Sequence, residues 1–84
     1  MKYRIKIIPK AEKDLNEVSG NDFDAVRKRI LSLSENPRPF GCKKLTADDG
    51  YRLRSGNFRI LYRIDDHAKE VTIYRVKHRK EAYR

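Results

Sequence analysis

The sequence predicts a small α+β fold, in which a helical hairpin packs on one face of an antiparallel-rich sheet of four strands, followed by a short C-terminal tail. Alternation of apolar and polar residues, the period of a half-buried strand, recurs in four segments. Apolar residues spaced three and four apart, the period of a helix, follow the first segment. A chain of 84 residues suffices for one domain, residues 1–84, with a thin core.

The first predicted strand spans residues 2–8, where basic and apolar residues alternate. We expect Tyr3, Ile5 and Ile7 to face the core. Pro9 ends the strand and can open a helix, because the first helical turn needs no amide donor from it. The residues expected on the opposite face of the strand are Lys2, Arg4 and Lys6.

Two helices are predicted before the remaining strands. Residues 19–21 end the first helix, whose apolar residues are Ala11, Leu15 and Val18. Asn21 or Asp22 can cap a second, longer helix, which ends before Pro37 because the residue before a proline disfavours the helical conformation. The apolar residues of this second helix are Phe23, Val26, Ile30 and Leu33.

A loop over residues 40–49, with Leu45 expected under the sheet, leads to the other three strands. Short turns with small or polar residues join these strands into a meander. The strands are predicted over residues 51–54, 58–64 and 70–76. Residues 77–84 form a polar tail that is too short for a stable isolated helix.

The formal charge of +9 is concentrated in the second half of the chain. Residues 1–50 have a surplus of three basic residues and residues 51–84 a surplus of six. Such a surface favours nucleic acid or an acidic protein as the partner, with a membrane least favoured. Cys42 is the single cysteine, so we expect no internal disulfide, no metal site and no cofactor. The absence of a long apolar run predicts a cytoplasmic protein without a signal peptide.

In several segments the chain resembles the RelE/ParE superfamily of bacterial and archaeal toxins. The likeness includes the strand before Pro9, the helical hairpin that ends in Asn36-Pro37-Arg38, and Lys44-Leu45 in the loop. It continues through Tyr51-Arg52-Leu53-Arg54, Phe58-Arg59-Ile60-Leu61-Tyr62 and the end of the chain from Val76 to Tyr83. The arginines of the hairpin, followed by a terminal histidine, arginine and tyrosine, are closer to the RelE branch.

The resemblance implies a ribosome-dependent endoribonuclease that cuts messenger RNA in the decoding site and is held inactive by a cognate antitoxin. By motif, Arg59 matches the phosphate-contacting arginine, Arg79 the C-terminal catalytic arginine and Tyr83 the terminal tyrosine. Arg52 and Arg54 fall where RelE proteins have lysines. Some relatives use a glutamate base on this strand, but the segment between Tyr51 and Arg59 contains no glutamate.

The residues themselves indicate the same kind of chemistry. RNA can be cut without a metal when its 2′-hydroxyl attacks the adjacent phosphorus, provided that cations surround the phosphate and a base takes the proton. Arg59 is the best candidate for the phosphate, because a guanidinium donates two parallel hydrogen bonds. His78 is the nearby residue with a suitable intrinsic pKa, although a histidine near a terminus is often simply exposed. Tyr83 can stack on a base, assist proton transfer or pack the tail.

The remaining cationic positions predict RNA contacts. Arg52 and Arg54 share one strand face and can follow a backbone together, or can be a solvated pair of like charges. The predicted RNA-binding residues are Lys43, Lys44, Arg63 and Lys77. Two alternatives to the nuclease stay open, namely a ParE-like inhibitor of DNA gyrase and an inert binding domain that keeps only the electrostatics.

Overall fold

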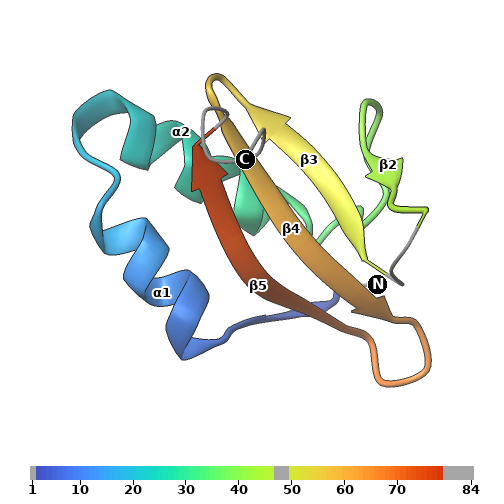
Figure 1. The fold of residues 1–84 in the computed structure, drawn as a ribbon. Helices are drawn as coiled ribbons and strands as arrows, with labels where there is room; N and C mark the ends of the chain where they lie inside the picture. Colours follow the sequence, from blue (N-terminus) through green and yellow to red (C-terminus); the bar gives the residue numbers. More distant parts are fainter. Residues whose placement is uncertain (1, 47–49, 79–84) are drawn as a thin grey trace.

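The computed structural model describes residues 2–46 and 50–78, and within them the chain forms two helices and one mixed sheet (Figure 1). In chain order the elements are β1 (Arg4–Ile7), α1 (Pro9–Asn16), α2 (Gly20–Ser32), β2 (Lys43–Lys44), β3 (Tyr51–Ser55), β4 (Phe58–Asp65) and β5 (Glu70–His78). The predicted α+β class and the greater length of the second helix are confirmed. No helix among the described residues is long and apolar enough to cross a bilayer.

The sheet has five strands in the order β1-β5-β4-β3-β2, where four were predicted. β1 pairs in parallel with β5, and the other neighbours are antiparallel. The additional strand is β2, which pairs Lys43 with Arg52 and Lys44 with Tyr51. A strand of two residues is too short to show any alternation, so the sequence pattern could not predict it.

Both helices cover the same face of the sheet. Figure 1 views the molecule from the uncovered side, with α2 passing behind the strands and α1 beside β5. The buried apolar residues that join the two layers are Ala11, Leu15, Val18, Val26, Ile30, Leu33, Leu53, Ile60, Tyr62, Val71, Ile73 and Val76. Tyr3, Ile5 and Ile7 pack against this core as predicted, and Lys2, Arg4 and Lys6 are exposed.

The boundary between the helices differs from the prediction. α1 ends at Asn16, and α2 begins at Gly20 with Ser19 in the N-cap position, so capping by Asn21 or Asp22 is wrong. The φ of +60° at Gly20 is accessible because glycine lacks a Cβ. Val18 lies in the connection between the helices, where it is buried in the core.

β5 contains an extra residue that changes which face its side chains occupy. Leu61 pairs with Arg75 and Tyr62 with Ile73, so Tyr74 is a bulge opposite the bond between them. As a result Ile73 and Val76 both face the core although they are three residues apart. β5 also continues through His78, so Lys77 and His78 belong to a strand and not to the predicted tail.

Asp14 holds α1 against the part of β5 that β1 does not reach. The pairing of β1 ends at Ile7 opposite Ile73, because the chain turns into α1 at Pro9. Beyond this point the Asp14 carboxylate accepts the Val76 N–H at 3.0 Å. It also accepts the Nε–H of Arg75 at 2.8 Å.

Candidate nucleic-acid interface

The face of β2, β3, β4 and β5 that the helices leave uncovered is called the open face below. Residues paired directly across neighbouring strands lie on the same face, about 5 Å apart. One row on the open face joins Lys43, Arg52, Leu61 and Arg75. The next row joins Arg54, Arg59 and Lys77. The pairing therefore gathers six cationic residues from four strands, of which Arg75 binds Asp14.

A hollow of about 190 Å³ lies between these rows. Its lining residues are Leu45, Arg52, Arg59, Leu61 and Lys77, and we call it the cationic hollow. Leu45 lies here on the open face beside Leu61, so its predicted place under the sheet is wrong. The two leucines provide an apolar lining between three cations, a combination that suits a ligand with both a flat apolar part and a phosphate.

The positive charge of the open face is concentrated at one end of the strands, where Arg54, Arg59 and Lys77 pair. Arg54 and Arg59 are directly opposite each other, as are Arg59 and Lys77, and like charges in such positions repel. An anion placed among them relieves this repulsion. At the other end of the sheet Glu70 pairs with Arg4, with 3.9 Å between the guanidinium and the carboxylate. The end that contains the cationic hollow is thus the better anion site.

Two other predicted RNA-binding residues lie apart from the hollow. The Arg63 guanidinium lies 4.4 Å from the centre of the Tyr74 ring, an arrangement that holds its charge over an aromatic face. The Lys44 ammonium lies 5.2 Å from the centre of the Tyr51 ring. Because Tyr51 pairs with the core residue Tyr62, Lys44 belongs to the side opposite Lys43.

His78 is not brought together with Arg59. It pairs with Phe58, whose ring it meets edge-on at 5.1 Å between ring centres. The pocket beside it is lined by Asp14 of α1 and by Glu17 and Val18 of the connection that follows, so His78 faces the helix layer. Arg79 and Tyr83, the other two terminal residues assigned to catalysis, lie outside the described residues. Their roles stay predictions.

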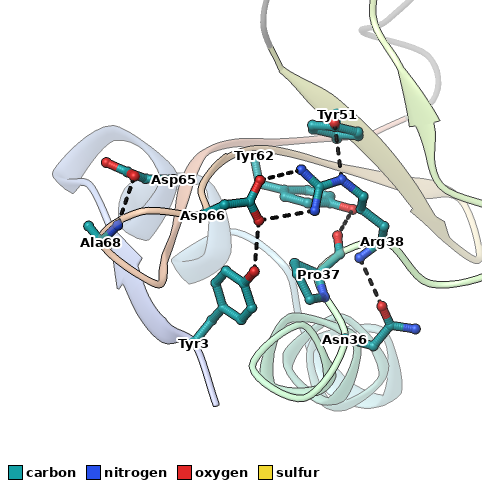
Figure 2. A network of polar contacts seen from close by, with 9 residues as sticks. All are labelled: Tyr3, Asn36, Pro37, Arg38, Tyr51, Tyr62, Asp65, Asp66 and Ala68. Atoms are coloured by element: carbon teal, nitrogen blue, oxygen red, sulfur yellow. Dashed lines mark hydrogen bonds and ion pairs between the residues drawn. The ribbon is translucent and has the colours of Figure 1, made fainter. Parts of the chain in front are cut away.

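The strongest polar cluster involves residues to which the sequence analysis assigned no role. Arg38 donates two hydrogen bonds to the Asp66 carboxylate, at 3.1 and 2.8 Å, and the Tyr3 hydroxyl donates a third at 2.7 Å (Figure 2). These bonds lower the pKa of Asp66 to about 2 from an ordinary value of 3.8. They also raise the pKa of Arg38. No local pattern signals this pair, because its members are 28 residues apart in the sequence.

The cationic hollow offers charge and shape, and no metal ligands. Within residues 2–46 and 50–78, no three His, Cys, Asp or Glu side chains lie close enough to hold one metal ion. Arginine and lysine can bind a phosphate and stabilise the negative charge that develops on it during transfer. The described part of the hollow contains no group with an ordinary pKa near neutrality.

Comparison with known proteins places the chain in a family. A family model described as the ParE toxin of type II toxin–antitoxin systems matches residues 5–83. The toxin RelG of Mycobacterium tuberculosis is 34% identical over 87 residues, which cover 100% of this chain and 99% of that protein. The RelBE2 toxin–antitoxin complex of the same organism contains a similar chain, with a TM-score of 0.83 and 32% identity. The match covers 94% of this chain and 100% of that chain. The archaeal RelE–RelB complex of Pyrococcus horikoshii also contains a similar chain, with a TM-score of 0.82 and 30% identity. The match covers 94% of this chain and 97% of that chain.

Proposed function

Since this chain belongs to the ParE toxin family of type II toxin–antitoxin systems and is RelE-like, we propose that it is a ribosome-dependent endoribonuclease. In this proposal the protein acts in the cytoplasm, cleaves messenger RNA in the ribosomal A site and so inhibits translation. The observation that supports it is the meeting of Arg52, Arg59 and Lys77 at one hollow on the open face.

The proposed reaction is an attack of an RNA 2′-oxygen on the adjacent phosphorus. The 2′-hydroxyl loses its proton to a base as it attacks, the bond from phosphorus to the 5′-oxygen breaks, and the leaving 5′-oxygen takes up a proton. The products are a 2′,3′-cyclic phosphate and a 5′-hydroxyl end. Arg59 lies on β4, between cations of two neighbouring strands, and donates paired hydrogen bonds to the phosphate oxygens. Arg52 and Lys77 stabilise the additional charge of the transition state from either side.

The other assigned residues have secondary or still-untested roles in the proposal. Lys43, Arg54 and Arg63 extend the cationic surface along the RNA backbone, and Lys44 contacts RNA from the β2 edge. Arg79 and Tyr83 complete the site from the end of the chain. His78 is the weakest member, because its pairing with Phe58 separates it from the phosphate position of Arg59.

A cleavage assay tests the proposal. Purified protein is incubated with ribosomes carrying a defined message, and the 5′ ends of the products are mapped. Cleavage in the decoding site, lost in Arg59→Ala and Arg79→Ala and retained in Arg27→Ala, is the expected result. Arg27 is a matched control because it is an exposed arginine on α2, away from the open face. An intact message at saturating protein overturns the proposal.

A cognate antitoxin is the proposed partner of the cationic hollow in the inactive state. Both of the similar solved structures named above are complexes of a toxin with its antitoxin. Because the open face is cationic, we propose that the antitoxin covers it with an acidic or amphipathic segment. Competition between that segment and RNA for the same surface then accounts for the inhibition.

A second candidate function is the inhibition of DNA gyrase without nuclease chemistry. The observation in its favour is the description of the matching family model, which names ParE toxins. A supercoiling assay run beside the ribosome assay separates the two. Loss of supercoiling with an intact message selects gyrase, and cleavage with normal supercoiling selects the nuclease.

A further inference from the structure

The last part of the connection between α2 and β2, residues 36–42, is called the braced loop below, because side chains of the sheet and of the β4–β5 turn bind it. The Tyr62 hydroxyl, which is buried in the core, donates a hydrogen bond to the Pro37 carbonyl at 2.8 Å. Arg38 binds Asp66 and also donates from Nε to the Tyr51 hydroxyl at 3.3 Å (Figure 2). These bonds hold Pro37 and Arg38 against the sheet.

The braced loop ends in a tight turn with Phe40 at its tip. The Cys42 N–H donates to the Pro39 carbonyl at 3.0 Å, and Gly41 has a φ of +95°. This is the geometry of a type II β-turn, with proline first and glycine third. Phe40 occupies the second position, where the side chain projects outward, and it is 97% exposed.

Such exposure of an aromatic ring is unusual in this molecule. Leu31 is the other large apolar residue exposed within the described part of the chain, and it is only 47% exposed. Folding gains nothing from Phe40, since its ring is almost entirely in water. Single exposed apolar residues are common on protein surfaces, but here the backbone that carries the ring is held by the turn hydrogen bond from Cys42 to Pro39. A ring in water on an ordered turn suits a stacking contact, because the backbone needs no ordering on binding.

The position of Phe40 relates it to the cationic hollow. β2 is antiparallel to β3, with Lys43 opposite Arg52, so the chain before Lys43 runs toward Arg54. The turn that carries Phe40 therefore lies toward the end of the sheet that carries the row of Arg54, Arg59 and Lys77. Two strand spacings, about 10 Å, separate the β2 edge from β4. Figure 1 shows the loop before β2 at this outer edge.

We propose that Phe40 is a stacking platform for an unpaired base of the RNA whose phosphates occupy the open face. An exposed aromatic ring beside a cationic groove is the usual means of holding single strands without regard to sequence. Lys43 and Lys44, which follow it, are both exposed and provide the local charge. The inference rests on the proposed function for the nature of the ligand, and it does not depend on cleavage.

A tryptophan reporter tests this contact directly. The chain contains no tryptophan, so Phe40→Trp introduces a single indole at the tip of the loop. Binding of a short, unstructured RNA should quench its fluorescence, because a stacked base quenches indole. Leu31→Trp, on α2, is the matched control and should keep its fluorescence. Both measurements use free RNA without ribosomes and keep Arg59, so they report binding whether or not the protein is a nuclease.

Affinity measurements separate stacking from other effects. Phe40→Ala should weaken binding of the same RNA by about 5- to 150-fold, the range found for loss of one base–aromatic stack. Phe40→Leu, which keeps apolar area and removes the π face, should behave like Phe40→Ala. The dependence of affinity on salt should be unchanged in both variants, because stacking releases no counterions.

Three results overturn the inference. One is an unquenched indole at position 40 together with wild-type RNA affinity in Phe40→Ala. Another is full affinity in Phe40→Leu, which indicates simple apolar contact. The third is quenching by an antitoxin peptide and not by RNA, which makes Phe40 a protein-docking residue.

Discussion

The carboxylate of Asp14 accepts the main-chain N–H of Val76 at 3.0 Å and so takes the place of a neighbouring strand where β1 has turned away. The same carboxylate binds the Arg75 side chain, and both side chains are largely shielded from water. One helix residue thus completes the edge of β5 just before the strand reaches Lys77. The position of this lysine in the cationic hollow depends on that edge.

Replacing Asp14 should therefore destabilise the fold. Asp14→Ala leaves the Val76 amide and the Arg75 guanidinium without this acceptor and should lower the free energy of unfolding by about 2 kcal/mol. Asp14→Asn retains an acceptor and should cost less. Urea denaturation measures both, with Glu17→Ala, also near the C-terminal end of α1, expected within about 0.5 kcal/mol of the parent. Equal losses in Asp14→Ala and Glu17→Ala would contradict this role.

The pair of Arg38 and Asp66 should make stability depend on acid pH. The pKa of Asp66 is about 2 in the folded protein, below its ordinary value of 3.8. The folded state therefore binds a proton at Asp66 less readily than the unfolded state does. The contribution of Asp66 to the free energy of unfolding is complete above about pH 4 and is lost as the pH falls toward 2. Asp66→Asn should be less stable than the parent at pH 7.

The difference in melting temperature between the parent and Asp66→Asn should then shrink as the pH is lowered from 4 to 2. Asp65→Asn is the control, since Asp65 accepts only the Ala68 N–H of its own turn at 2.9 Å among the bonds described here. A difference between the parent and Asp66→Asn that stays constant over this range would show that the carboxylate charge is irrelevant.

Removing the Tyr62 hydroxyl should loosen the braced loop. Tyr62→Phe leaves the Pro37 carbonyl without its buried donor and should cost about 1–3 kcal/mol of unfolding free energy. Tyr51→Phe should cost less, because the bond from Arg38 to Tyr51 is solvent-exposed. Denaturant titration measures the two costs. If the ordered backbone of the braced loop supports stacking at Phe40, Tyr62→Phe should also weaken RNA binding. An unchanged RNA affinity would limit the role of the Tyr62 hydroxyl to stability.

The cations of the hollow should determine the salt dependence of RNA binding. Each lost phosphate contact should reduce the slope of log K against log salt by about 0.7 for single strands. Arg59→Ala and Lys77→Ala should each show this reduction, whereas Arg27→Ala on α2 should not. Binding isotherms at several salt concentrations provide the slopes. Identical slopes for the hollow variants and the α2 control would place the RNA elsewhere.

The regular elements of this fold are readable from the sequence because their residues repeat with a period. Alternation correctly places Tyr3, Ile5 and Ile7 toward the core, and the arginines of β3 away from the core residue Leu53. The same reasoning finds the two hairpins, since their turns contain small and polar residues. These are local properties, and local pattern is sufficient to describe them.

The parts that could not be predicted depend on contacts between distant residues. The bulge at Tyr74 breaks the alternation of β5, so strict alternation from Ile73 would place Lys77 on the core face and His78 on the open face, the reverse of their pairing in the structure. β2 is a strand because it pairs with β3, and no local pattern marks it. Arg38 binds Asp66, which is 28 residues away in the sequence. The sequence pattern predicts a loop over residues 40–49, but it predicts neither the turn at Phe40 nor its exposure.

The extra residue at Tyr74 has a consequence for how the surface of this toxin tolerates a change in chain length. Tyr74 has no partner of its own on β4, so its deletion would leave Leu61 opposite Arg75, Arg59 opposite Lys77 and Phe58 opposite His78. The bulge is therefore a spare residue in β5, and a single-codon deletion at this position removes the irregularity without turning Lys77 away from Arg59.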